Sequence, residues 1–466
     1  MKYTPVSSKG VADGGPGQEK ALEEAQIRDK TVVEGSGKLD FGEYELELWD
    51  LRYNGVLGRG RGSRGGAGGG RGAWAWVRTS CVPLAIIVTL SLVIVVIALL
   101  DDSLARHSDG SLAGDQCRPR HPTTHSAWLN LLTSAQHSVD IAAFYWTLLN
   151  SDVSNHSFPS AKLGEEVFEK LKETGLREGV AMRIAQNAPS HISPQKNSAV
   201  LAALGAAKVR SLDFKRLMSG GVLHTKMWLV DQRHVYLGSA NMDWRALTQV
   251  KELGIVIYNC SSLALDMQKI FDSSPPPFCP EGRSGDVDAI VDVIGKAERF
   301  VYVAVMDYFP KTLYEKKTKF WPVLDDALRR AAMERGVKVR LLASHWSHTR
   351  ADLPTFLRSL SALSSNATRV HIETRVFVVP AFTPEQQDIP FSRVNHNKYM
   401  VTDKAGYIGT SNWSADYFTN TGGIGLVINE TAGGAAGAGG GARAQLQALF
   451  ERDWHSVYAR PVEEVV

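Results

Sequence analysis

Hydrophobic and polar positions follow the same order twice in the second two-thirds of the chain. The first copy has strand-like runs at 139–146, 179–184 and 207–210, separated by helical spacing at 163–171 and 199–204. The second copy has strand-like runs at 300–306, 336–341 and 375–380, with helical spacing at 323–333 and 357–363 between them. This rhythm predicts an α/β fold of βαβ units, with parallel strands covered by helices on both faces. The repetition predicts two halves packed about a pseudo-twofold axis.

A different hydrophobic pattern precedes these halves. Residues 81–100 are predominantly apolar and carry no charge, and at about 1.5 Å per residue they would cross roughly 30 Å of hydrocarbon. Arginines lie before this run, and Asp101 and Asp102 follow it. Since positive charge stays on the cytosolic side, the pattern predicts a single transmembrane signal anchor with everything after it luminal.

The predicted domain boundaries follow from these patterns. Residues 1–79 are rich in glycine, glutamate and arginine and are predicted to be a disordered cytosolic tail. The anchor takes residues 80–100 and a luminal stem 101–126, followed by halves at 127–272 and 273–466. The run 59–66 resembles an RNA-binding Arg-Gly segment, but a flexible basic flank beside the anchor is the favoured interpretation.

Each half ends in the same short motif. The shared pattern is His-x-Lys, then an aspartate, then Gly-Ser/Thr-x-Asn, on apolar flanks that predict a strand. Residues two apart on a strand share a face, so each histidine should stand beside its own lysine. The aspartate, beside a turn signal, is predicted to pin the hairpin as a structural residue. The motif residues are His224, Lys226, Asp231, Ser239 and Asn241 in the first copy and His396, Lys398, Asp403, Thr410 and Asn412 in the second.

Paired His-x-Lys motifs suit the cleavage of a phosphodiester. That reaction needs a nucleophile, a proton donor and cations that neutralise the phosphoryl oxygens. The two histidines would supply the first two, Lys226 and Lys398 the positive charge, and Asn241 and Asn412 hydrogen bonds. No cluster of carboxylates of the type that binds Mg²⁺ accompanies the motifs, so we expect no metal and no other cofactor.

The overall composition of the chain says little about its function. A chain of 466 residues with 44% hydrophobic and 22% charged residues is ordinary for a folded protein, and a net charge of +3 favours neither nucleic acid nor membrane. Of the few cysteines, Cys117 and Cys260 are candidates for one disulfide in an oxidising lumen. Glycosylation sequons follow the anchor, which agrees with a luminal domain; their acceptors are Asn155, Asn259, Asn366 and Asn429. Asn412 also fits the sequon rule, but as a motif residue it should stay unmodified.

The paired motifs resemble the HKD motif of the phospholipase D superfamily. Segments 221–228, 237–245, 247–254, 394–402 and 408–414 look like a vertebrate subgroup, members three and four, and segments 325–330 and 334–342 favour member three. That resemblance implies the phospholipase D fold in one luminal catalytic domain. It also implies a type II glycoprotein of the endoplasmic reticulum, Golgi, late endosome and lysosome. The same resemblance allows the catalytic domain to be released from its anchor as a soluble lysosomal form.

The resemblance also implies an activity. The subgroup is identified with 5′→3′ exonuclease action on single-stranded DNA and RNA through a phosphohistidine, without metal. Phospholipase D or transphosphatidylase action on lysosomal phospholipids is the alternative substrate class. A catalytically weak membrane glycoprotein is the second alternative, and the complete His/Lys/Asn sets argue against it. A homodimer is compatible with each of these.

Roles within the site follow from one asymmetry. Glu252 occupies the place where relatives hold a carboxylate against a catalytic histidine, whereas the matching stretch 421–427 has no acid. We therefore expect the first half to hold the better oriented histidine. This predicts His224 as nucleophile and His396 as general acid/base, although pseudo-symmetry leaves the reverse open.

Other features qualify the resemblance. The aromatic residues Trp244, Trp413, Tyr145 and Tyr308 lie near motif or strand ends and could stack on bases, but core packing is the favoured interpretation for each. This chain lacks residues that relatives carry after Cys117 and between Phe271 and Ser273. These two gaps put the completeness of the sheets in doubt. His345 stands where relatives have a cysteine.

Overall fold

The computed structural model describes residues 30–34, 46–50, 121–272, 283–429 and 441–465. The helices are α3 (Thr124–Ser134), α4 (Lys162–Gly175), α5 (Lys196–Ala203), α6 (Phe214–Met218), α7 (Trp244–Thr248), α8 (Ser261–Asp272), α9 (Asp286–Lys296), α10 (Val323–Arg335), α11 (Leu353–Ser361), α12 (Pro384–Asp388), α13 (Ala415–Thr419) and α14 (Ala442–Trp454).

The strands fall into two large sheets and two short pairs. They are β1 (Lys30–Glu34), β2 (Leu46–Asp50), β3 (Ser138–Ala143), β4 (Trp146–Thr147), β5 (Ala181–Asn187), β6 (Lys208–Leu212), β7 (Met227–Val230), β8 (His234–Gly238), β9 (Met242–Asp243), β10 (Leu253–Ile257), β11 (Ser284–Gly285), β12 (Phe300–Val305), β13 (Tyr308–Phe309), β14 (Lys338–Ser344), β15 (Ile372–Phe377), β16 (Lys398–Thr402), β17 (Ala405–Gly409), β18 (Trp413–Ser414), β19 (Gly423–Asn429) and β20 (Ala459–Pro461).

The two sheets repeat one topology, as the hydrophobic pattern predicts. The first half contributes the order β10-β8-β7-β3-β5-β6 and the second half β19-β17-β16-β12-β14-β15. In each, the two βα units pair in parallel and the motif hairpin pairs antiparallel beside them. The sheets are therefore mixed: the strands of the βα units are parallel, as predicted, and the motif strands run antiparallel beside them. Successive motif strands are joined by tight turns, and such turns reverse the chain.

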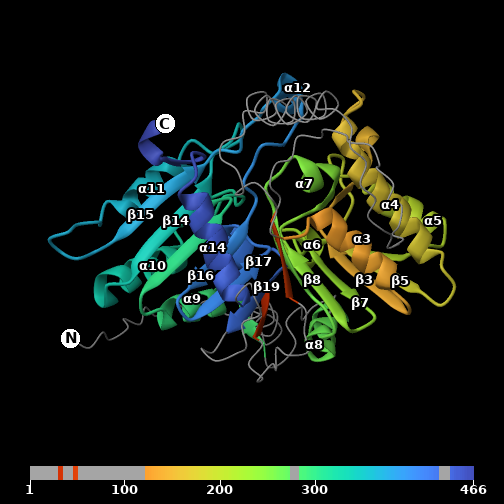
Figure 1. The fold of residues 1–466 in the computed structure, drawn as a ribbon, viewed down its shortest axis with the longest axis horizontal. Coiled ribbons are helices and arrows are strands. Elements are labelled where there is room, and N and C mark those ends of the chain that lie inside the picture. The colour runs from red at the N-terminus through yellow and green to blue at the C-terminus, as the bar shows by residue number, and fades with distance from the viewer. Residues whose placement is uncertain (1–29, 35–45, 51–120, 273–282, 430–440, 466) are drawn as a thin grey trace, which may run out of the picture. The chain divides into compact units, whose positions relative to one another are not determined.

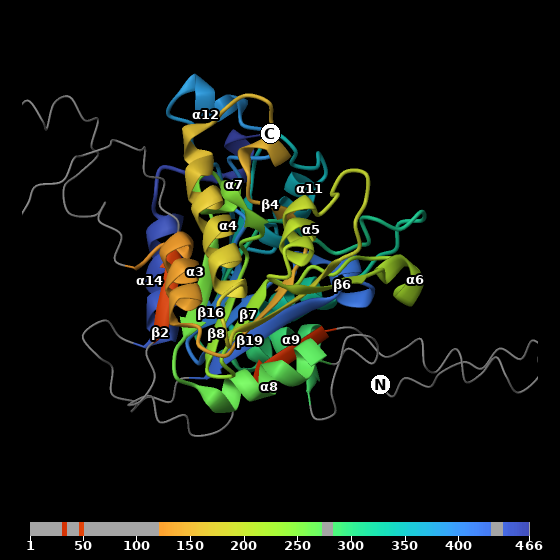
Figure 2. The same ribbon diagram turned by 90° about the vertical axis from the view of Figure 1, so that its right-hand side faces the viewer.

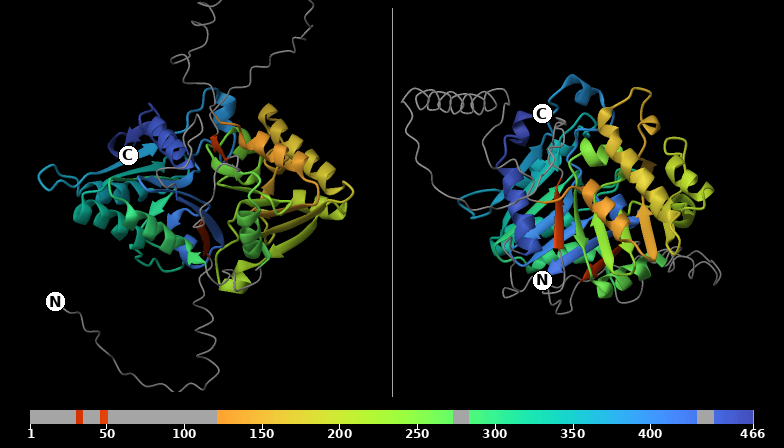
Figure 3. Two further views of the ribbon diagram at one scale, coloured as in Figure 1. Left: turned by 60° about the horizontal axis from the view of Figure 1, so that its bottom comes forward. Right: turned by 45° about the vertical axis from the view of Figure 1, so that its right-hand side comes forward.

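Successive side chains along a strand point to opposite faces of its sheet. One face packs against helices, and the other packs toward the opposite half. Along β12, Val301 and Val303 pack in the cluster that contains α9, α10 and α11, whereas Tyr302 and Ala304 pack in a second cluster. That second cluster also contains Leu229 of β7 and residues of α8 and α14, so it joins the two halves. Helices α3, α4 and α5 cover the outer face of the first half (Figure 2). The result is two sheets facing each other at the centre, with helices outside (Figures 1 and 3).

Two strands lie within the tail that the sequence predicts to be disordered. Strand β1 pairs in parallel with β19 and antiparallel with β11, and β2 pairs antiparallel with β10. Both sequences, KTVVE and LELWD, contain the β-branched or apolar residues that favour strands, and both satisfy backbone groups at the edge of a sheet. A segment paired in this way lies on the same side of a membrane as its sheet. These pairs and a cytosolic tail therefore exclude one another.

Several predictions concern residues outside the described ranges. The apolar run 81–100 and the cysteines Cys81, Cys117 and Cys279 lie there, so the anchor and the disulfide stay predictions. Among the described residues, none of the helices has the length and apolar character that crossing a membrane requires. Cys260 is described, and it is a buried free thiol whose Sγ lies 3.7 Å from Ser262 Oγ.

The sequon asparagines lie where glycosylation requires them to lie. Asn155, Asn259, Asn366 and Asn429 are all exposed, whereas Asn412 is buried. This distribution agrees with modification of the four exposed acceptors and with an unmodified Asn412.

Candidate active site

The two motif histidines lie just before strands β7 and β16, and the backbone of each is held by the opposite half. The amide of His224 donates to the carbonyl of Gly422 at 2.7 Å, and the amide of His396 donates to the carbonyl of Lys251 at 2.8 Å. Gly422 and Lys251 precede the equivalent strands β19 and β10. This reciprocal exchange brings both motifs to the seam between the sheets, as the predicted pseudo-symmetry requires.

The His224 ring is fixed by a backbone carbonyl and by aromatic rings. Its Nδ1 lies 2.7 Å from the Thr410 carbonyl oxygen, which accepts only if Nδ1 carries a proton. The Nε2 of a neutral ring then keeps its lone pair. Phe144 and Tyr417 both pack against the imidazole, each with its ring centroid 5.1 Å away. The arrangement presents an oriented, neutral imidazole.

The His396 ring is fixed by a carboxylate instead. Its Nδ1 lies 2.9 Å and 3.0 Å from the two carboxylate oxygens of Glu252. Ser239 donates its hydroxyl to the same carboxylate at 2.5 Å, and Glu252 is almost fully buried. The expectation that Glu252 orients the histidine of its own half is therefore wrong. Because each motif is held by the other half, the carboxylate of the first half meets the histidine of the second.

Each motif lysine stands beside its own histidine, as predicted. Lys226 Nζ donates to the carbonyl of His224 at 2.7 Å, and Lys398 Nζ donates to the carbonyl of His396 at 2.5 Å. Both lysines are buried. Burial lowers the pKa of Lys226 well below its usual value, and Lys398 lowers it further. Burial also lowers the pKa of Lys398 to about 7, although Glu252 and Asp307 oppose the change.

The electrostatic environments of the two histidines differ. Burial lowers the pKa of His224 well below its usual value, and the charges of Lys226 and Lys398 add to the effect. Burial lowers the pKa of His396 as well, but there the Glu252 carboxylate acts in the opposite direction. His396 is therefore the better proton carrier of the pair, and His224 is the better held neutral base.

The motif asparagines reach the same seam with amide groups that are only partly satisfied. Asn241 Nδ2 donates to the Tyr145 hydroxyl at 3.3 Å, and Asn412 Nδ2 donates to Asp307 Oδ2 at 3.2 Å and to the Tyr417 hydroxyl at 3.3 Å. Both Oδ1 atoms are buried without a partner among the described residues. These contacts orient both amides. Asn412 Nδ2 has both of its donors in use, whereas Asn241 Nδ2 keeps one donor for a substrate, and the two Oδ1 atoms can act only as acceptors.

Asp307 is a site residue that the sequence interpretation missed. It lies two residues beyond the end of β12, as Tyr145 lies two residues beyond the end of β3, and the two contact equivalent asparagines. Partial removal from water raises the pKa of Asp307 to about 6, against the positive charges of Lys398 and Arg350. Aligning the residues after the equivalent strands, Phe144-Tyr145 with Met306-Asp307, would have found this position.

The remaining motif residues have structural roles. Asp231 accepts from the backbone amides of residues 136–138 at 2.7 to 2.8 Å, and Asp403 accepts from those of residues 298 and 299 at 3.0 to 3.1 Å. Both aspartates thus hold the start of a neighbouring strand, β3 or β12, and not the hairpin that the sequence suggested. Thr410 Oγ1 accepts from the Ile424 amide at 3.0 Å, as Ser239 Oγ accepts from the Leu253 amide.

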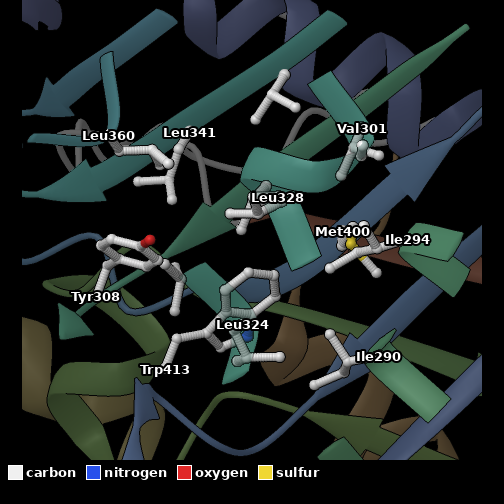
Figure 4. Packing of buried hydrophobic residues seen from close by; sticks show 14 of the residues in the cluster. Ile290, Ile294, Val301, Tyr308, Leu324, Leu328, Leu341, Leu360, Met400 and Trp413 are labelled. Atoms are coloured by element: carbon white, nitrogen blue, oxygen red, sulfur yellow. The ribbon is translucent and has the colours of Figure 1, made fainter. Parts of the chain in front are cut away.

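The aromatic residues considered for base stacking belong to the core. Trp244, Trp413 and Tyr308 are almost fully buried, and Tyr308 and Trp413 lie among the aliphatic side chains of the second half (Figure 4). Tyr145 donates its hydroxyl to Asp243 at 3.0 Å, and Asp243 is paired with Arg245 at 2.6 Å. Tyr145 therefore positions Asn241. The favoured interpretation, core packing, is confirmed for Trp244, Trp413 and Tyr308.

The described residues contain no group of three or more His, Cys, Asp or Glu side chains arranged to hold a metal ion. The charges that face the seam come instead from the lysine, histidine and carboxylate groups above.

Comparison with known proteins agrees with this geometry. The family described as "PLD3/4, PLD-like domain" matches residues 116–274 and 270–382. The chain belongs to the PLD3/4 family. The human protein named 5′-3′ exonuclease PLD3 is 46% identical over 387 residues, which cover 74% of this chain and 77% of the relative. Human 5′-3′ exonuclease PLD4 is 44% identical over 377 residues, which cover 72% of this chain and 73% of the relative.

A solved structure shares the fold at low sequence identity. Phosphatidylserine synthase of Haemophilus influenzae aligns with a TM-score of 0.50 and 10% identity, over 73% of this chain and 86% of that one. At this identity the likeness shows only that the two-half PLD-like architecture of this chain has a counterpart.

Proposed function

We propose that this chain hydrolyses phosphodiester bonds of single-stranded DNA and RNA as a 5′→3′ exonuclease, through a phosphohistidine and without a metal ion. The observation that carries the proposal is the convergence of two buried His-Lys-Asn sets on one seam, each ring held by a different Nδ1 partner. The names of the PLD3 and PLD4 relatives support the substrate class and the direction.

In the first step, His224 attacks phosphorus. Its Nε2 lone pair forms the P–N bond while the bond from phosphorus to the leaving oxygen breaks, and His396 transfers its Nε2 proton to that oxygen. The Thr410 carbonyl keeps the His224 Nδ1 proton in place, so the nucleophilic nitrogen faces the substrate. Lys226, Lys398 and the remaining Nδ2 donor of Asn241 stabilise the charge on the phosphoryl oxygens.

In the second step, His396 is neutral and acts as a base. It takes a proton from water, the water oxygen bonds to phosphorus, and the P–N bond breaks to return neutral His224. His396 is protonated before the first step and again after the second, and the Glu252 carboxylate stabilises this imidazolium through Nδ1. This is the same assignment of roles that the sequence suggested. The reason for the assignment differs, because Glu252 contacts the proton carrier His396 and not the nucleophile His224.

We expect single-stranded 3′-labelled DNA to be shortened from its 5′ end with EDTA present at a rate within about twofold of the rate without it, because lysine ammonium groups supply the positive charge. The measurement is a time course on denaturing gels, with phosphatidylglycerol assayed in parallel. Full loss with EDTA and recovery with Mg²⁺ would overturn the metal-independent mechanism. Turnover of the lipid without turnover of DNA would overturn the substrate class.

An acidic optimum should follow from Asp307. Its carboxyl faces Lys398, Arg350, Asn412, Tyr314 and Tyr417, and its pKa is raised to about 6. Above that pH the carboxylate opposes an approaching phosphate, whereas below it the neutral acid does not. In the unaltered protein, kcat/KM should fall between about pH 5 and pH 7 as Asp307 ionises. In Asp307→Asn this fall should be roughly 3- to 10-fold smaller, because asparagine stays neutral. A pH profile of both proteins measures this, and parallel profiles would contradict it.

We propose the membrane placement on separate grounds. Arginines before residues 81–100 and exposed sequon asparagines after them support a type II glycoprotein with a luminal catalytic domain. This topology is incompatible with the pairing of β1 and β2 to the sheets, because it separates them by the membrane. Protease protection of the N-terminal segment in intact vesicles decides between the two arrangements.

A further inference from the structure

Exposed aromatic rings form a stack beside the seam, outside the residues used above. Phe391, which follows α12, stacks on His348 with ring centroids 4.6 Å apart and an interplanar angle of 12°. Trp346 meets the same histidine edge-on at 4.7 Å. Phe391 is 61% exposed and His348 is also exposed, so one face of the stack is open to solvent. We define Trp346, His348 and Phe391 as the aromatic platform.

The backbone that carries Phe391 is strained and firmly held. Its φ of 53° lies in the left-handed region, which is unfavourable for a bulky residue. The neighbouring residues are tied to the first half, since Arg245 donates to the Pro390 carbonyl at 2.8 Å and the Arg393 amide donates to the Gln249 carbonyl at 3.1 Å. The chain thus holds an apolar ring in solvent. Strain of this kind is concentrated at binding sites.

The other two rings of the platform are held by a tight turn. The amide of Trp346 donates to Thr349 Oγ1 at 2.8 Å, and the Thr349 amide donates to the Trp346 carbonyl at 3.0 Å. His348 lies inside this turn, so the turn fixes the position of its backbone, and its ring contacts Trp346 and Phe391.

The platform lies at the edge of the sheet that carries the active site. Its turn follows β14, whose last residue, Ser344, accepts from the amide of Asn395, next to His396. Arg350, two residues beyond His348, is close enough for its charge to act on Asp307 in the site. The Arg350 side chain is 49% exposed and 3.8 Å from Asp352, which leaves its charge accessible to a phosphate.

The first half has no such platform in the equivalent loop. Residues 188–195, which follow β5 as residues 345–352 follow β14, read APSHISPQ and contain His191 but no phenylalanine, tyrosine or tryptophan. Its most prominent apolar side chain is Ile192, which is 96% exposed. Of these two equivalent loops in the described part of the chain, only the one that follows β14 carries the aromatic rings, and such an asymmetry suits a directional substrate.

We propose that the aromatic platform binds nucleobases of a single-stranded nucleic acid that extends from the active site, with Arg350 facing the adjoining phosphate. The proposal rests on the exonuclease function proposed above. Stacking uses the π-face that every base has, and an accessible guanidinium complements the backbone charge, so binding should be independent of sequence. A paired base has its faces covered by its neighbours, so the platform should favour single strands over duplexes.

The test compares Phe391→Ala with Phe391→Trp on two substrates. A single-stranded oligonucleotide reaches the platform, whereas p-nitrophenyl thymidine phosphate occupies only the site of bond cleavage. We expect Phe391→Ala to raise KM for the oligonucleotide about 5-fold or more while kcat/KM for the small ester stays within about twofold, and Phe391→Trp to restore the lower KM. Ile192→Ala is the matched control, because it removes an exposed apolar side chain from the equivalent loop of the other half, and it should change neither value.

A second arm removes the base instead of the ring. An oligonucleotide series with one abasic position should include a position at which KM rises in the unaltered protein but not further in Phe391→Ala. If the oligonucleotide is cleaved and Phe391→Ala leaves its KM unchanged, the platform is wrong while the exonuclease function stands. If no oligonucleotide is cleaved, the exonuclease function itself fails. An effect of Phe391→Ala on lipid turnover alone would assign the platform to lipid and overturn the proposal.

Discussion

Replacing His224 with alanine is expected to lower kcat/KM for single-stranded DNA by about 10,000-fold or more, the scale seen when a covalent nucleophile is removed. Alanine has no lone pair to attack phosphorus, and its methyl group does not replace the ring that packs against Phe144 and Tyr417. The Thr410 carbonyl would also lose the donor that it accepts from. Initial rates on a 5′-labelled oligonucleotide measure the loss.

The control for this variant is His137→Ala. His137 is exposed, and its hydrogen bonds use its backbone: its amide donates to Asp231, and its carbonyl accepts from the Ala181 amide. The variant keeps both bonds. Its activity should stay within about twofold of the unaltered protein, since surface substitutions of this kind change little. If His224→Ala retained more than about a hundredth of the activity with unchanged folding, a nucleophile other than His224 would be required.

The architecture of the described part could be predicted from the sequence because it depends on local periodicity. Apolar runs mark β3, β5, β12 and β14 within a few residues, and amphipathic spacing marks α4 and α10 between them. The motif hairpins followed from repetition alone. Strands β1 and β2 escaped prediction because short apolar stretches in a polar, Gly-rich segment gain strand structure only from the sheet edges that they meet.

The sequence predicted which residues form the site, but not which of them contact one another. His224, Lys226, His396 and Lys398 carry a pattern that can be read along the chain, and the structure brings them together. The partner of Glu252 could not be read in this way. Local order places Glu252 in the first half, whereas the exchange of backbone hydrogen bonds across the seam places its carboxylate on His396.

Asp307 and the aromatic platform were missed for a related reason. Neither belongs to the repeated motif, and each is defined by where a strand ends in space. Asp307 follows β12, and Trp346 and His348 follow β14, at the sheet edge that also carries His396. Loops at such an edge carry function on a rigid scaffold, but their residue types are not repeated between the halves.

The division of labour between the histidines gives the second large expected effect. His396→Ala should lower the rate on an oligonucleotide by about 100- to 10,000-fold, because the leaving sugar oxygen then departs without a proton. The same variant should lose far less in the first step on p-nitrophenyl thymidine phosphate, since p-nitrophenolate is stable unprotonated. His224 is intact in this protein, so the P–N bond still forms.

The base for the second step is absent from that protein, and this makes the intermediate visible. Phosphohistidine should accumulate in His396→Ala after reaction with a radiolabelled p-nitrophenyl ester, and it should be absent from His224→Ala and from a variant that lacks both rings. Rapid denaturation followed by peptide mapping locates the label. Label on His396 in the His224→Ala protein, with none in His396→Ala, would reverse the roles. Glu252 would then orient the nucleophile, and the Thr410 carbonyl would hold the proton carrier.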